Sequence, residues 1–228
     1  MTAFLAGARL VRLRLLSVAS LLGLGVALLS VFVVALLERR AGSIVAADRA
    51  LTGVALGFVL PLLAHGTVAR ALAGARLDAA LGDIGRWGGD RRAGALGVAL
   101  SLSLVLGLAG ALIAALAVGV VRAPADPLLW RDTLTSAWIG ALAGASYAGW
   151  FCLGSTLGKR GGGRGVVLIV DWIAGASAGA AALFWPRGHV RNLLGAEPVL
   201  AMPQWTATLA LVVLGSAYVA LSAWRVRR

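Results

Sequence analysis

Residues 154–160, Gly-Ser-Thr-Leu-Gly-Lys-Arg, come close to a phosphate-binding loop but depart from its pattern at two positions. A loop that wraps the phosphates of ATP has four residues between its two glycines and a Ser or Thr after its lysine, whose hydroxyl reaches Mg²⁺. Here three residues separate Gly154 from Gly158, and Arg160 follows Lys159. We therefore interpret this segment as the positively charged end of an apolar stretch and expect no ATP to bind through it.

A serine and a histidine are the next residues that could do chemistry, because a base within hydrogen-bond reach activates a hydroxyl nucleophile. Ser146 lies in the sequence Gly-Ala-Ser-Tyr, and His189 follows later in the chain. The pair resembles that of rhomboid proteases, which also span the membrane six times. Their nucleophile motif is Gly-x-Ser-Gly and their histidine lies in a later span, whereas Tyr147 replaces the second glycine here and His189 falls in an expected loop. We favour Ser146 as a small packing residue.

Two titratable residues fall inside apolar stretches. Asp171 is the one acidic residue in an expected span, and carboxyl groups within the membrane mark functional sites by default. Asp171 could line a cavity, or it could pair with Arg164 or Lys159 near the headgroups. His65 could line a polar path, although a hydrogen bond to a neighbouring helix is the favoured interpretation. The chain has two histidines and one cysteine, so we expect neither a metal site nor an internal disulfide.

The composition is that of a membrane protein. Of the 228 residues 60% are hydrophobic and 13% charged, and the mean hydropathy is +0.91. A soluble domain would have about 25% charged residues. The net charge of +12 could suggest a nucleic-acid partner, but the arginines flank apolar runs, as basic residues do beside membrane spans. We expect no nucleic acid as a partner.

The apolar runs predict an all-α, multi-pass protein in the cell (inner) membrane, with a single transmembrane domain over 1–228 and no soluble domain. Six spans are expected, at about 15–37, 50–69, 94–121, 134–157, 166–185 and 206–224. With both termini on one side, 14 of the 21 basic residues lie on that side. Since basic residues are enriched in cytoplasmic loops, both termini are predicted to be cytoplasmic. Residues 3–14 are expected to form an amphipathic helix at the membrane interface.

Two connecting segments have helical patterns of their own. In 76–92, Leu77, Ala80, Leu81, Ile84 and Trp87 recur at helical spacing among acidic and basic residues. The helix could rest on the membrane, but lipid-binding helices are mainly basic, so the mixed charges favour docking into a protein cleft. The segment 186–205 has prolines at 186, 198 and 203. It suits two short helices that return towards the membrane, or an ordinary exposed loop.

Together, the interfacial N-terminus, the six spans, the charged helix at 76–92 and the helical segment at 186–205 resemble the membrane subunits of type-2 ABC exporters. The resemblance covers the whole chain as an architecture and includes no short motif. It implies that residues 3–14 form an interfacial elbow, that 76–92 form a coupling helix, and that 186–205 fold as re-entrant helices.

The resemblance also implies a transport role without enzymatic activity on this chain. ATP and Mg²⁺ would bind a separate ABC ATPase subunit, so this chain would hold no cofactor itself. The ATPase would dock on Leu77, Asp78, Leu81, Asp83, Ile84, Arg86, Trp87, Asp90, Arg91 and Arg92. Two permease chains, identical or related, would enclose the path for a hydrophobic or amphipathic substrate, which His65 and Asp171 could line.

Two other classes compete with this interpretation. A membrane scaffold or accessory subunit, with no path of its own, requires only apolar packing between helices. An ion- or proton-coupled carrier would require more charge inside the membrane than Asp171 and His65 supply.

Overall fold

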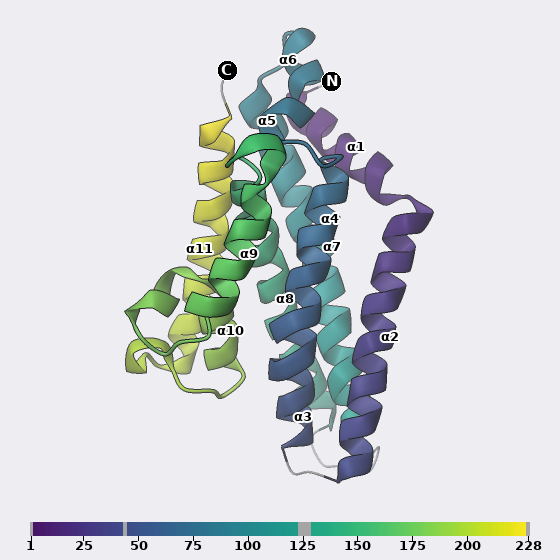
Figure 1. Cartoon of the computed structure of the whole chain (residues 1–228), viewed down its shortest axis with the longest axis vertical. Helices are drawn as coiled ribbons and strands as arrows, with labels where there is room; N and C mark the ends of the chain where they lie inside the picture. Colours follow the sequence, from purple (N-terminus) through teal and green to yellow (C-terminus); the bar gives the residue numbers. More distant parts are fainter. Residues whose placement is uncertain (1, 43–44, 123–128, 227–228) are drawn as a thin grey trace.

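Every described element of the chain is a helix. The structure is a computed structural model that describes residues 2–42, 45–122 and 129–226. The long helices run along one axis of an elongated bundle (Figure 1). The predicted all-α class is confirmed.

The first part of the bundle contains a short N-terminal helix and two long ones. Its elements are α1 (Ala3–Leu15), α2 (Val18–Ala41), α3 (Ala46–Asp48), η1 (Arg49–Val59) and α4 (Leu60–Ala71). The Ser17 hydroxyl accepts a hydrogen bond from the Ser20 amide and so separates α2 from α1. The three elements from Ala46 to Ala71 form one continuous helix. Its π-helical stretch, η1, ends just before Pro61, which the helix accommodates without ending.

The second part contains the connecting helices and the rest of the bundle. Its elements are α5 (Leu77–Ala80), α6 (Gly82–Arg86), α7 (Arg91–Val121), α8 (Leu129–Gly154), η2 (Lys159–Gly161), α9 (Gly163–Ala174), η3 (Ala180–Phe184), α10 (Pro186–Leu193), η4 (Val199–Ala201) and α11 (Gln204–Arg225). In Figure 1, α1 begins and α11 ends at the end of the bundle that carries α6. We call this the α6 end, and the opposite one the α3 end.

The expected fifth span, 166–185, is not one continuous helix. α9 ends at Ala174, and turns and the short helix η3 follow. Twelve residues of α-helix extend about 18 Å, which is less than the ~30 Å of a hydrocarbon core. The helix ends where the sequence becomes Gly-Ala-Ser-Ala-Gly, and the two glycines at 175 and 179 are poor helix formers. Consequently η3, α10 and η4 lie beside the middle of the bundle (Figure 1).

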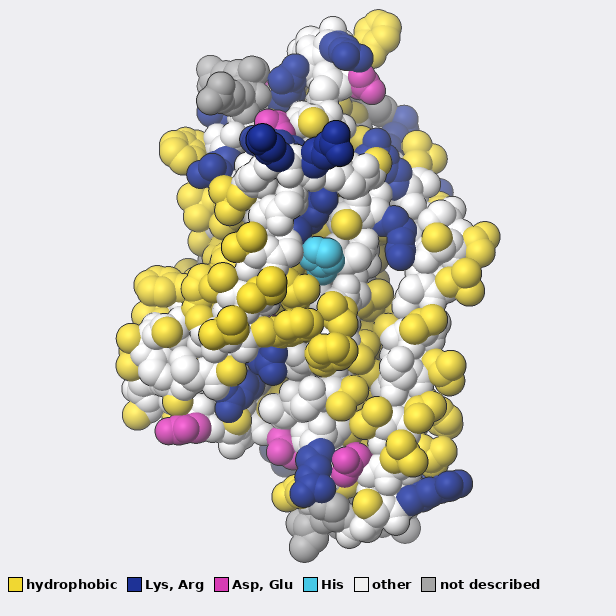
Figure 2. Space-filling view, in the orientation of Figure 1, with side chains coloured by type: hydrophobic (Ala, Val, Ile, Leu, Met, Phe, Trp, Pro, Cys, Tyr) yellow, Lys and Arg dark blue, Asp and Glu magenta, His cyan; other side chains and the backbone are white. Residues whose placement is uncertain are grey.

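Within the described ranges, four helices are long and apolar enough to cross a membrane. They are Val18–Ala41, Ala46–Ala71, Arg91–Val121 and Gln204–Arg225. On the face shown in Figure 2, basic side chains gather towards both ends of the molecule, with a largely apolar surface between them. The length and composition of these helices, together with this distribution, indicate a membrane protein.

The most extensive helix contact joins α7 and α8. A methyl group added at Gly140 would overlap the carbonyl oxygen of Gly110, and one at Gly144 would overlap that of Leu106. The two backbones therefore touch directly, as small residues permit between helices in membranes. The small-residue pair at 140 and 144 thus has a packing role, whereas a methyl group at Gly53 would meet open space.

We predict that Gly140→Ala destabilises the bundle, because its methyl group forces α8 away from α7. Overpacking of this kind costs about 1 to 3 kcal/mol, which should appear as a lower midpoint of thermal unfolding in detergent. The matched control is Gly53→Ala, which adds the same methyl group to an exposed helix position and should leave the midpoint unchanged or raise it slightly. Equal midpoints for the two variants would contradict the close contact.

Candidate functional site

The segment expected to dock a partner, 76–92, forms two short helices with a clear inner and outer side. Leu77 and Leu81 are fully buried, and Ile84 is half-buried against Gly89 and Gly94. These three side chains face the body of the bundle. In the folded chain the apolar stripe of the segment therefore packs on the chain's own helices, and these three predicted docking residues lie on its inner side.

The outer side of this segment is a small exposed tip formed by Asp83, Arg86 and Trp87. The Trp87 side chain is 90% exposed. Beside it, the Arg86 guanidinium donates a hydrogen bond of 3.1 Å to the Asp83 carboxylate, and both side chains are at least 80% exposed. An exposed tryptophan next to charges of both signs has the composition of a protein-contact site.

The remaining predicted docking residues have structural partners. The Asp90 carboxylate accepts a hydrogen bond from the Arg92 amide and so caps α7. The Arg91 guanidinium lies over Gly85, and that of Arg92 donates to the carbonyl of Val226. Asp78 accepts two hydrogen bonds from Arg76. These contacts hold the tip on the bundle.

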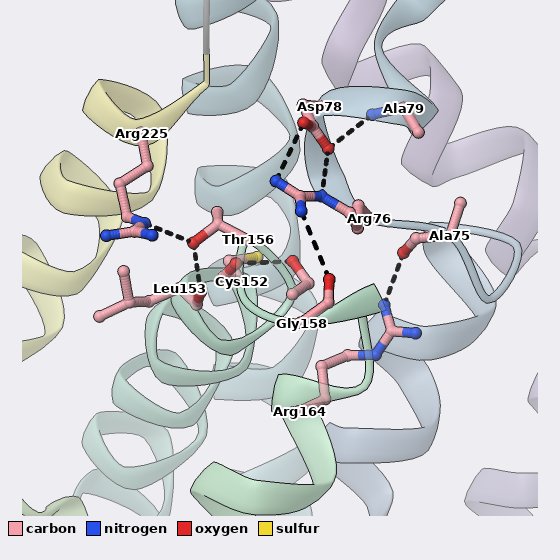
Figure 3. Close-up of polar contacts among 11 residues, drawn as sticks. Ala75, Arg76, Asp78, Ala79, Cys152, Leu153, Thr156, Gly158, Arg164 and Arg225 are labelled. Atoms are coloured by element: carbon pink, nitrogen blue, oxygen red, sulfur yellow. Dashed lines mark hydrogen bonds and ion pairs between the residues drawn. The ribbon is translucent and has the colours of Figure 1, made fainter. Parts of the chain in front are cut away.

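Arginine side chains tie this segment to the turn between α8 and α9 (Figure 3). Arg164, at the start of α9, donates to the carbonyls of Gly74 and Ala75 at 3.0 and 2.9 Å. In the other direction, Arg76 donates to the carbonyl of Gly158, and the Leu77 amide donates to that of Ser155. The two connecting segments at the α6 end are therefore joined by hydrogen bonds in both directions.

The near match to a phosphate-binding loop is part of this turn. Ser155 and Thr156 donate to the carbonyls of Cys152 and Leu153, which lie in the last turn of α8. The Thr156 hydroxyl also accepts from Arg225 (Figure 3). The hydroxyls of this segment satisfy carbonyls at a helix end.

Asp171 joins three helices. Its carboxyl group is fully buried and accepts hydrogen bonds from the Tyr147 hydroxyl of α8 at 2.9 Å and from the Arg187 amide of α10 at 3.2 Å. The second bond caps the N-terminus of α10. Arg164, one of the two ion-pair partners expected from the sequence, binds the carbonyls of Gly74 and Ala75 instead, and within this chain the Asp171 carboxyl group is enclosed rather than open to a path.

The other candidate residues also have structural contacts. His65 packs edge-on against the ring of Phe151, with 5.6 Å between ring centroids. Ser146 donates to the carbonyl of Leu211, and His189 contacts that of Leu183. The serine and the histidine therefore each have a different backbone carbonyl as partner. Among the described residues there is no cluster of three or more His, Cys, Asp or Glu that could bind a metal.

Sequence reasoning missed Tyr147 and treated Arg164 only as a possible partner of Asp171. A buried tyrosine hydroxyl requires a partner, but nothing in the sequence indicates which of the neighbouring helices supplies it.

Comparisons of the chain with protein families, with curated proteins and with solved structures found no match.

We predict that Tyr147 and Asp171 are energetically coupled. Tyr147→Phe and Asp171→Asn should each lower stability by about 1 to 3 kcal/mol, because each leaves a buried polar group with a missing or altered partner. The double variant should lose less than the sum of the two. The measurement is thermal unfolding of the single and double variants in detergent.

Tyr218→Phe provides the matched control for this cycle. The Tyr218 hydroxyl donates to the carbonyl of Phe184 and not to Asp171. Its combination with Asp171→Asn should therefore be closer to additive. If the Tyr147 and Tyr218 cycles gave equal coupling, the assigned hydrogen bond would be incorrect.

Proposed function

We propose that this chain is a permease subunit of an ATP-binding-cassette transporter, and that a separate ATPase subunit docks on its α6 end. The observation that carries the proposal is the tip formed by Asp83, Arg86 and Trp87. An exposed tryptophan and an exposed ion pair project from two short helices whose apolar side is already buried in the bundle. A partner with a complementary cleft would bury the indole ring, a frequent source of binding energy at interfaces.

The contacts of α9 support a mechanical role. Arg164 and Asp171 lie two helical turns apart on this helix. Arg164 holds the backbone next to the docking segment, and Asp171 holds the N-terminus of α10. A displacement of the docking segment by the ATPase would therefore be carried along α9 to α10, beside the middle of the bundle.

In the proposed topology the α6 end and both termini face the cytoplasm. α9 would then begin and α11 would end at the cytoplasmic side, and η3, α10 and η4 would form a re-entrant region between them (Figure 1). Non-helical backbone is tolerated at membrane depth where protein covers it. α10 is largely buried within this chain, whereas most residues of η3 and η4 are exposed and would be covered by the second permease chain. In this arrangement α9, the re-entrant region and α11 would together take the place of the fifth and sixth spans expected of the type-2 exporter class.

Two copies of this chain, or this chain and a related permease, would enclose the path. Exposed apolar side chains cover much of α2, whose most apolar window is 17% buried. Such a surface suits lipid or a second permease chain. The proposed substrate is hydrophobic or amphipathic and is transported out of the cell. Such a substrate fits a bundle with few polar groups between its helices.

The test is copurification of the full chain with the ATPase encoded beside it or expressed with it. Wild type should retain the ATPase, and the variant with Asp83→Arg and Trp87→Ala should lose it, because the pair changes the charge of the tip and removes its indole ring. Loss of at least tenfold in retained ATPase corresponds to roughly 1.4 kcal/mol or more of binding free energy.

The matched control is Trp130→Ala, which removes an exposed tryptophan at the α3 end. This variant should retain the ATPase. Full retention by the Asp83 and Trp87 variant would exclude docking at the tip. If no ATPase copurifies even with wild type, the scaffold alternative takes precedence.

A further inference from the structure

A groove runs between the N-terminal helix α1 and helix α7. Its volume is about 510 Å³, and its walls are mainly apolar, with Leu5 and Leu16 on one side and Leu104 and Val105 on the other. This size is within the range of small-molecule sites, about 300 to 1,000 Å³. The groove lies outside the docking tip and the Asp171 contacts.

The position of α1 on α7 is fixed by direct backbone contact. A methyl group added at Gly7 would overlap the carbonyl of Gly94, and one at Gly97 would overlap that of Phe4. One wall of the groove is therefore held rigidly against the other. A site built on two helices in direct contact is largely pre-formed and requires little ordering when it binds a ligand.

Two basic side chains border this apolar groove. Arg9 and Arg12 are three residues apart and so lie on one face of α1. Within the described part of the chain, neither guanidinium has a hydrogen-bond or ion-pair partner. α1 contains no acidic residue, and none of the groove's lining residues is acidic.

We infer that this groove binds one anionic phospholipid, with its phosphate between Arg9 and Arg12 and an acyl chain against α7. A guanidinium presents paired N–H donors that match phosphate oxygens. The Ser101 hydroxyl also lines the groove and supplies a third polar group. The apolar walls of the groove accept the hydrocarbon of the acyl chain. The headgroup and the acyl chain therefore each contact a part of the groove with matching polarity. A zwitterionic lipid satisfies the arginines less well because of its own positive charge.

A second copy of this chain is a poorer occupant. In a two-fold symmetric contact, the same patch of each copy meets. Arg9 and Arg12 of both copies would then lie close together without acidic partners in the groove, and like charges at an interface are unfavourable. An anionic lipid removes this repulsion. The inference requires only that the chain lies in a membrane and does not depend on the proposed transport function.

The experiment uses the full chain purified in a neutral detergent. It is mixed with dioleoyl phosphatidylglycerol, or with dioleoyl phosphatidylcholine as the zwitterionic comparison, and retained lipid is measured by native mass spectrometry. Wild type should retain phosphatidylglycerol in preference, at one copy per chain. Arg9→Gln combined with Arg12→Gln should weaken this retention about tenfold or more, because two basic contacts are lost.

Three further variants separate a built site from general charge attraction. Arg39→Gln with Arg40→Gln removes the same charge at the α3 end and should leave retention unchanged. Ser101→Leu keeps both arginines but fills the groove, so it should weaken retention. Arg9→Lys with Arg12→Lys keeps the charge and should preserve most of the binding, which also distinguishes lost binding from misfolding.

The inference would be overturned by equal retention of the two lipids, by equal loss in the Arg39 and Arg40 variant, or by wild-type retention in the Ser101→Leu variant. It would also be overturned if the lipid-free chain were a dimer that Ser101→Leu, which fills the groove, dissociates. Failure of ATPase copurification would contradict the proposed function and leave the lipid site standing.

Discussion

The rest of the bundle depends on the direct backbone contact between α7 and α8. In a membrane the burial of apolar side chains provides little driving force for helix association, because lipid is as apolar as the side chains themselves. Close approach at Gly110 and Gly140 instead gains dispersion contacts along two long helices. α1 and α2 then pack on α7, while α4, α9 and α11 pack on α8. The order of layers follows from this one contact.

A second constraint is that buried polar groups must be satisfied inside the protein. The Asp171 carboxyl group accepts from both Tyr147 and the first turn of α10, so the end of a short helix is paired where water is scarce. Arg164 satisfies carbonyls at Gly74 and Ala75 in the same way. These bonds pair the first turn of α10 and the backbone before α5 with side chains of α9, so both segments are satisfied within the protein.

The two ends of α9 therefore connect parts of the molecule that are distant in sequence. One end holds the segment that carries the exposed tip, and the other holds α10 beside the middle of the bundle. For the proposed transport function this arrangement is significant, because a rigid element that joins a docking site to a path can carry motion from one to the other. α2 is attached mainly to α7 and the helix Ala46–Ala71, and its outward face remains apolar.

The sequence by itself determined the class, because apolar runs and flanking arginines predict a helical membrane protein. Three long helices begin and end within a few residues of their expected spans; these helices are Ala46–Ala71, Arg91–Val121 and Gln204–Arg225. The sequence also identified 76–92 as a distinct charged segment. Only the tertiary structure decided which face of that segment is free, because Leu77 and Leu81 suit a partner's cleft and the chain's own bundle equally well. The tertiary structure likewise decided the partners of Asp171 and the short length of α9. The hydrophobic periodicity of a sequence describes each helix alone, whereas contacts between helices depend on which helices are neighbours.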